Sequence, residues 1–208
     1  MRSADLHRVR SFPPQVGVGC TLLVLGTVPS VRSLELRQSY GHSHNLFWPF
    51  MGELFDAGPE LAYAERIARL QRIGIGIWDV LECCERPGSL DSAIVRTSEI
   101  ANDIPGLLAR YPAIRAIALN GGKAQQAFRR HVVPVLDEAV LARTRLLDLP
   151  STSPANASIP RSVNSSRRPN LPTMVAFKEE FPYLRCESGQ LFEFSRDWLH
   201  AADCCRVK

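Results

Sequence analysis

The segment from residue 40 to residue 49 gathers, in a short stretch, the side chains that a nucleobase pocket needs. It reads Tyr-Gly-His-Ser-His-Asn-Leu-Phe-Trp-Pro and so combines aromatic rings, two imidazoles and one amide. Aromatic faces can stack on a base that has left the double helix, and an amide can read the edge of that base. A core aromatic cluster with hydrogen-bonded polar groups has the same composition. Taken alone, the segment leaves both interpretations open.

Of two further segments, the first allows close approach of the backbone, and the second carries groups that suit a phosphate or another anion. Residues 26–34 read Gly-Thr-Val-Pro-Ser-Val-Arg-Ser-Leu, and residues 149–156 read Leu-Pro-Ser-Thr-Ser-Pro-Ala-Asn. Glycine allows close approach of the backbone, proline stiffens a turn, and short hydroxyl side chains and backbone N–H groups can bind an anion. Each segment alone also fits an ordinary turn after a strand.

The elements around these segments must position them. Apolar runs predict buried strands at residues 21–25, 75–80, 114–120 and 144–149. Helical spacing predicts helices at residues 48–55, 61–73, 104–111 and 123–136, the last one weakened near its end by His131 and Pro134. Alternating strands and helices indicate a parallel sheet flanked by helices. Because catalytic loops in such sheets lie beyond the carboxyl ends of the strands, the loops after Leu25, Leu119 and Leu149 are the ones to examine.

Taken in order, the three segments resemble one protein family. A strand followed by Gly-Thr-Val-Pro-Ser, then Gly-His-x-x-Asn-x-Phe-Trp-Pro, then Leu-Pro-Ser-Thr-Ser-Pro-Ala-Asn is similar to the hypoxanthine-DNA glycosylase branch of the uracil-DNA glycosylase superfamily. Shorter stretches at residues 11–14, 78–80, 88–91 and 120–124 resemble the same branch. The resemblance covers residues 11–157. It implies an α/β fold with three layers, α/β/α, around a central, mainly parallel, four-stranded sheet.

The resemblance implies a DNA repair enzyme that releases a deaminated base, preferably hypoxanthine, by hydrolysis of its N-glycosidic bond. Most of the superfamily positions the attacking water with an Asp or Asn in the first loop, where this chain has Thr27 and Val28. The hypoxanthine branch is similar in this lack and relies on the Asn of its His-x-x-Asn segment, so the resemblance implies Asn45 as the main catalytic residue. Its amide could orient water with the carbonyl oxygen or donate to the base with the NH₂ group. Since an amide is too weak a base to remove a proton early, the mechanism is expected to be dissociative.

Further roles follow from the same resemblance. Phe47 is expected to stack on the flipped base or to be a core residue, and Tyr40 to wall the pocket. His42 is expected to contact the base or a phosphate, or to be a structural histidine. The base pocket also includes Gly26, Thr27 and Val28. The expected DNA-binding residues are Pro29, Ser30, Lys123, Ser151, Thr152, Ser153, Pro154 and Asn156, although Lys123 also fits a solvated lysine at a helix start.

Three charged residues in or near the family-like stretches are left outside the expected site. These are Asp79, Arg86 and Asp91. Asp91, together with Ser89, is instead expected to cap a helix that starts near Ser92.

The overall composition fits an intracellular protein with a polyanionic partner. The chain has 208 residues, a net charge of +4 and an isoelectric point near 8.9, although charge alone does not identify nucleic acid as the partner. No apolar run approaches the roughly 18 residues of a membrane span, and residues 1–14 lack the apolar centre of a secretory signal. We expect a cytoplasmic monomer, nucleoid-associated in a prokaryote, with double-stranded DNA as its partner and no membrane contact.

The cysteines predict neither a metal site nor a disulfide framework. Six are present, and none forms a Cys-x-x-Cys spacing. A metal held by His200 with Cys186, Cys204 and Cys205 is the alternative to reduced thiols, which are the rule inside cells. We expect no metal and no organic cofactor.

The composition changes after the third segment. We expect a glycosylase core at residues 1–157, a Ser/Pro/Arg-rich loop or linker at 158–172, and a divergent extension that packs on the core at 173–208. Two other functions remain open at this stage. One is a glycosylase of the same fold that acts on uracil or on mismatched bases, and the other is a DNA-binding protein with impaired catalysis.

Overall fold

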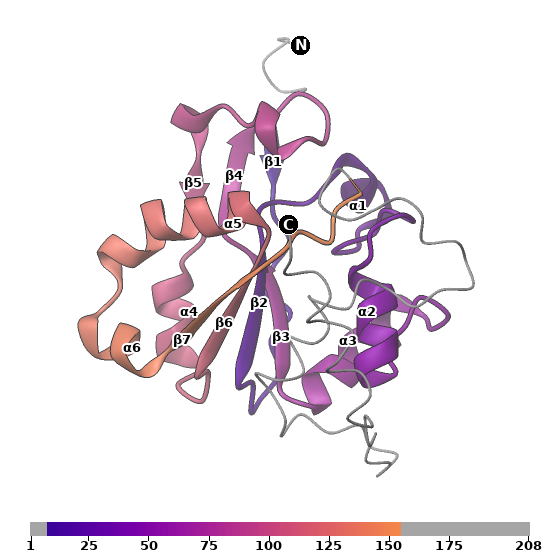
Figure 1. The fold of residues 1–208 in the computed structure, drawn as a ribbon, viewed down its shortest axis with the longest axis horizontal. Coiled ribbons are helices and arrows are strands. Elements are labelled where there is room, and N and C mark those ends of the chain that lie inside the picture. Colours follow the sequence, from indigo (N-terminus) through magenta and orange to yellow (C-terminus); the bar gives the residue numbers. More distant parts are fainter. Residues whose placement is uncertain (1–7, 155–208) are drawn as a thin grey trace, which may run out of the picture.

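The computed structural model describes residues 8–154 (Figure 1). Its strands are β1 (Arg8–Arg10), β2 (Leu22–Gly26), β3 (Ile75–Asp79), β4 (Leu81–Glu85), β5 (Ile100–Ala101), β6 (Ala116–Asn120) and β7 (Arg145–Leu149). Its α-helices are α1 (Val31–Leu36), α2 (Phe47–Phe55), α3 (Tyr63–Arg72), α4 (Ile104–Arg110), α5 (Gly122–Ala127) and α6 (Glu138–Arg143).

Four parallel strands form the central sheet, in the order β3-β2-β6-β7. All four were predicted from their apolar runs, and the predicted parallel sheet is confirmed. Leu25 of β2 pairs with Trp78 of β3 on one side and with Leu119 of β6 on the other. This register brings the carboxyl ends of neighbouring strands to one edge of the sheet.

Helices cover both faces of this sheet, which confirms the three-layer arrangement (Figure 1). Because side chains alternate along a strand, Leu23 and Leu25 join one buried cluster with residues of α4 and α5, whereas Leu22 and Val24 join a second cluster with residues of α2 and α3. Burial of this apolar surface on both faces is the main stabilising contribution to such a layered fold.

A small antiparallel sheet, in the order β1-β4-β5, was not predicted. The sequence suggested a single strand at residues 75–80, but β3 ends at Asp79 and β4 begins at Leu81 in the other sheet. Through this change of sheet the chain stays bound to the first loop. The N–H of Val80 donates to the carbonyl of Gly26 (2.9 Å), and the N–H of Leu81 donates to that of Thr27 (3.0 Å).

The helix predicted at residues 123–136 is interrupted. α5 is followed by a π-helical turn, Phe128–Val132, and by a 3₁₀ turn, Val133–Val135. Pro134 has no N–H to donate to the preceding turn, so the regular hydrogen-bond pattern does not continue through it.

The expected loop or linker at 158–172 and the expected extension at 173–208 lie outside the described residues, as do the three C-terminal cysteines. Within residues 8–154, no helix combines the length and apolar character of a membrane span.

Candidate active site

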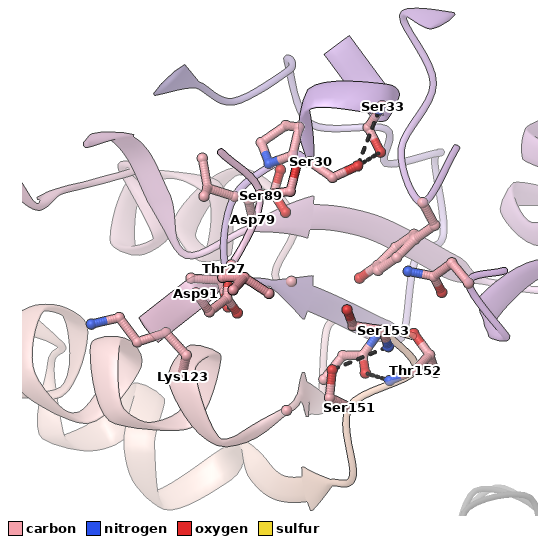
Figure 2. A pocket seen from close by; sticks show the side chains of 18 of the residues that line it. Thr27, Ser30, Ser33, Asp79, Ser89, Asp91, Lys123, Ser151, Thr152 and Ser153 are labelled. Atoms are coloured by element: carbon pink, nitrogen blue, oxygen red, sulfur yellow. Dashed lines mark hydrogen bonds between the residues drawn. The ribbon is translucent and has the colours of Figure 1, made fainter. Parts of the chain in front are cut away.

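A pocket of about 480 Å³ lies at the carboxyl ends of the parallel strands. Its walls come from loops that are far apart in the sequence (Figure 2). Figure 2 shows Ser30 and Ser33 on one side of the pocket and Ser151–Ser153 on the opposite side. The lining consists of residues 26–30, 89–92, 120–123 and 151–153, together with Ser33, Ser39, Tyr40, Asn45, Asp79 and Arg86.

A buried polar network holds the first loop. The hydroxyl of Thr27 donates to Oδ2 of Asp91 (2.8 Å), and Nη2 of Arg86 donates to the carbonyl of Pro29 (2.6 Å). Arg86 also lies 3.9 Å from Asp91, with its own side chain only 1% exposed. The helix cap expected from Asp91 is wrong, because Asp91 begins a 3₁₀ turn that has no side-chain cap. Its carboxylate is bound to Thr27 instead.

Gly26 lies between the side-chain oxygen atoms of two other residues on the pocket floor. A Cβ atom at this position would stand 2.6 Å from Oδ1 of Asp79 and 3.1 Å from the hydroxyl of Tyr40. Burial, followed by the nearby charge of Asp91, raises the pKa of Asp79 to about 7, although Arg86 opposes this effect. The floor therefore holds a carboxyl group that titrates near neutral pH.

Tyr40 is held firmly in the wall of this pocket. Its backbone lies in the left-handed region (φ 56°), which is uncommon for a bulky residue. Its ring stacks on Phe47, with centroids 3.8 Å apart and planes 16° apart, and Phe47 in turn meets the edge of Trp48. The hydroxyl of Tyr40 is buried and finds no hydrogen-bond partner within residues 8–154.

The amide of Asn45 is oriented by the start of α2. Its Oδ1 accepts a hydrogen bond from the backbone N–H of Phe47 (2.9 Å). Its own backbone N–H donates to the carbonyl of His42 (2.8 Å), which closes the turn before the helix. This bond uses one of the two lone pairs of the oxygen and fixes the plane of the amide, and no hydrogen bond from the NH₂ group to another residue is found within residues 8–154.

Thr152 connects three of the walls. Its hydroxyl accepts from Nδ2 of Asn120 (2.9 Å), and its backbone N–H donates to Oδ1 of the same residue (3.0 Å). Its carbonyl accepts from the N–H of Leu46 (3.0 Å). The loop after β7 is thus bound both to the end of β6 and to the residue that follows Asn45.

Lys123 lines the pocket but is not a freely solvated lysine. Its ammonium pairs with Glu99, whose side chain is completely buried and also meets Arg130 (3.0 Å) and His131 (2.7 Å). Burial acts to raise the pKa of Glu99, but hydrogen bonds from Lys123 and His131 outweigh it and hold that pKa below its usual range. The π-helical turn after α5 carries two of these three partners.

Comparison with known proteins agrees with this geometry. The model of the uracil DNA glycosylase superfamily matches residues 13–185 of the chain. The chain belongs to this superfamily. As the resemblance implied, it is a DNA glycosylase, an enzyme that hydrolyses N-glycosyl bonds.

Relatives of known name extend the comparison. Proteins named hypoxanthine DNA glycosylase from Methanosarcina acetivorans and Methanosarcina barkeri are 36% and 31% identical to the chain over 116 residues. Each match spans 55% of this chain and 72% of the relative. The solution NMR structure of a putative uracil DNA glycosylase from Methanosarcina acetivorans superposes with a TM-score of 0.59 at 31% identity, and the match covers 72% of this chain and 87% of that one.

The glycosylase pocket contains most, but not all, of the residues expected to bind base or DNA. Phe47 is only 2% exposed and lies behind Tyr40 rather than in the pocket lining. His42 also lies outside the lining, and its Nδ1 accepts from the N–H of His44 (3.1 Å). Pro154 is exposed beyond the lining, and Asn156 lies outside the described residues.

Among the lining residues that the expected site omitted, four carry a charged group or an amide. They are Asp79, Arg86, Asp91 and Asn120. A signal was present, because all except Arg86 lie in the short family-like stretches at 78–80, 88–91 and 120–124. Asp79 and Asn120 are moreover the last residues of their parallel strands, where ligand-binding side chains gather in such sheets.

The lining offers polar groups rather than a metal centre. Within residues 8–154, no group of three or more His, Cys, Asp or Glu side chains could hold a metal ion. The hydroxyl, amide and carboxyl side chains of the lining can form hydrogen bonds, and the carboxyl groups can transfer protons.

Proposed function

We propose that this glycosylase releases hypoxanthine from double-stranded DNA that carries deoxyinosine, with Asn45 as its main catalytic residue. The observation that carries the proposal is the orientation of the Asn45 amide in a pocket that also contains the floor residues Gly26 and Asp79. The names of the two Methanosarcina relatives support hypoxanthine as the base.

The orientation of Asn45 favours one of its two expected roles. Rotation of the amide to present its carbonyl oxygen to water would remove the acceptor from the N–H of Phe47. A buried N–H without a partner costs about 1–3 kcal/mol. The NH₂ group therefore acts as the donor that stabilises negative charge on the departing base, as fixed donors do at a developing anion.

We assign different roles in base binding to the two stacked aromatic residues. Tyr40 lines the pocket and has one face against Phe47. We assign contact with the base to Tyr40, and to Phe47 the support of that ring. This replaces the direct stacking role expected for Phe47.

Hydroxyl-bearing residues on opposite sides of the pocket suit the DNA strand. Ser30 caps α1 through its contact with the N–H of Ser33, so its position is fixed by the helix that it begins. Ser151 and Ser153 face it across the pocket (Figure 2). We assign the phosphates on either side of the flipped nucleotide to these two sides.

The test is single-turnover base release from labelled duplexes that each contain one deoxyinosine, one deoxyuridine or one mismatched thymine, followed by alkaline cleavage of abasic sites. Rapid release at deoxyinosine with little at the others is expected. Preference for uracil would mean that the enzyme is a uracil-specific member of the same superfamily. Release of no base, with DNA still bound, would contradict catalysis by this chain.

Two variants test the assigned donor. Asn45→Ala should lower the rate of base release on the order of 10²-fold while DNA binding persists, because one positioned donor is removed. Asn45→Asp keeps an oxygen for the N–H of Phe47 but replaces the amide donor, so it should lose a similar factor at pH 8. Full activity of Asn45→Asp would assign the work to the carbonyl oxygen instead.

A further inference from the structure

The roles assigned to Asn45 leave one ionisable group in the pocket unused. Asp79 ends β3, lines the pocket and is only 9% exposed. Its Oδ1 lies next to the floor position occupied by Gly26, where the absence of a side chain leaves room. Glycine at 26 is what keeps this carboxyl group in contact with the pocket.

The carboxyl group of Asp79 lacks the stabilising contacts that its neighbour Asp91 makes. Asp91 accepts a hydrogen bond from Thr27 and lies beside Arg86. In the part of the chain that the structure describes, no hydrogen bond to the carboxyl oxygens of Asp79 is found; Asn102 binds only its backbone carbonyl. A carboxyl group in a residue that is only 9% exposed loses most of its contact with water, and without a protein partner it is costly to a fold unless it serves a function.

The groups that face Asp79 come from each neighbouring loop. They are Arg86 and Asp91 after β4 and the phenol of Tyr40 after α1. Burial and then Asp91 raise the pKa of Asp79, and Arg86 lowers it. Burial, and then the charge of Asp79, raises the pKa of Tyr40, so this hydroxyl stays protonated. Asp79 is the one of these groups placed to exchange a proton near neutral pH.

We propose that Asp79, in its protonated form, is the general acid that protonates the departing purine. This inference rests on the proposed function and adds a second catalytic group to it. The bond between C1′ and N9 breaks and its electron pair stays with the purine, which accepts the proton from the Asp79 carboxyl group. Water then adds to C1′, and the proton that it loses returns to the Asp79 carboxylate. The products are free hypoxanthine and an abasic site, and the enzyme is regenerated.

An acid suits a purine leaving group in particular. The edge of a 6-oxopurine carries acceptors at N7 and O6, to which a protonated carboxyl group can donate. Neutral carboxyl groups in apolar surroundings act as donors in this way in other enzymes. Asn45 can only stabilise charge on the base by a hydrogen bond, whereas Asp79 can remove that charge.

The experiment is the pH dependence of single-turnover hypoxanthine release by the full chain. The unaltered protein should react at a constant rate below a pH of about 7 and about tenfold more slowly for each pH unit above it. We call this decrease in rate above pH 7 the alkaline limb of the pH profile. Asp79→Asn should lower the rate at pH 6 on the order of 10²-fold and abolish this limb, with DNA binding retained. Asp148→Asn on β7, an exposed carboxylate outside the pocket lining, is the matched control and should keep both rate and limb.

A second variant tests the assignment even if Asp79→Asn folds poorly. Because Asp91 raises the pKa of Asp79, Asp91→Asn should keep the limb and move it to lower pH. An unmoved limb in Asp91→Asn, or a preserved rate and limb in Asp79→Asn, would overturn the role of Asp79 alone. Failure of the unaltered protein to release hypoxanthine at any pH would overturn the proposed function, and this inference with it.

Discussion

Gly26 determines what can stand on the pocket floor. Its Cβ position is bounded by oxygen atoms of Asp79 and Tyr40 at 2.6 and 3.1 Å, distances at which an added methyl group cannot be accommodated without movement. Both oxygens belong to the groups proposed to act on or near the base. A change at this one residue therefore displaces groups on two other elements.

Gly26→Ala should lower base release by more than about tenfold and reduce the free energy of unfolding by about 1–3 kcal/mol, as overpacking of a core does. Single-turnover assays and chemical denaturation would measure the two effects. Gly122→Ala is the control for stability, because a Cβ there meets nothing within 4 Å. Equal stability of the two variants would contradict the crowding seen at Gly26.

The positions of Asn45, Phe47 and Tyr40 show which features of the site the sequence does and does not determine. Asn45 lines the pocket, and the expectation for it came from its family-like pattern and not from its neighbours. Phe47 and Tyr40 both carry aromatic rings in the segment 40–49, but Phe47 lies in the core and Tyr40 lines the pocket. Which of two aromatic rings faces a cavity depends on backbone direction, and composition does not reveal it.

At the scale of elements, Thr152 holds the loop after β7 against β6 and the start of α2. The hydroxyl and the backbone of this one residue bind the Asn120 amide at both of its ends. The loop carries Ser151 and Ser153, which we assign to DNA. Its rigidity should therefore matter for catalysis as well as for stability.

Thr152→Val should reduce the free energy of unfolding by about 1–3 kcal/mol, because it leaves the buried NH₂ group of Asn120 without its acceptor. It should also weaken binding of lesion-containing DNA, measured by titration of a labelled duplex. Thr152→Ser keeps the hydroxyl and should restore both quantities to near those of the unaltered protein. A valine variant that matches the serine variant would show that the loop is held by other contacts.

The strands differ in how well they can be predicted from the sequence. The parallel strands β2, β3 and β6 are apolar runs that are buried almost throughout, and the edge strand β7 keeps three leucines, so four were predicted close to their observed bounds. β1, β4 and β5 are short and mixed in composition, and they become strands by pairing with one another. The change of sheet at Val80 follows from contacts with the first loop, which no local pattern encodes.

At the scale of the whole molecule, two buried carboxyl groups affect stability in opposite directions. Glu99 is paired with three basic side chains, so its pKa is lowered; its contribution to stability is present at neutral pH and is lost as the pH falls. Asp79 has a raised pKa, so its contribution is greatest in acid and is lost as the pH rises through about 7. The first group stabilises the fold under ordinary conditions, whereas the second weakens it there.

This contrast predicts that the floor of the pocket costs the protein stability above neutral pH. Ionised Asp79 is buried without a hydrogen-bonded partner among residues 8–154, and replacement by a neutral amide removes its charge. Asp79→Asn should therefore raise the free energy of unfolding at pH 8 by at least about 1 kcal/mol, and by less at pH 5, where the unfolded chain is already ionised at this residue but the folded protein is not. Denaturant titrations at the two pH values would measure the difference, with Asp148→Asn as the control for loss of a carboxylate. If the gain at pH 8 accompanies the predicted loss of base release, the ionisable carboxyl group of Asp79 is retained for catalysis at the expense of stability. A variant that is less stable at pH 8 than at pH 5, relative to the unaltered protein, would instead mean that ionised Asp79 has a stabilising partner.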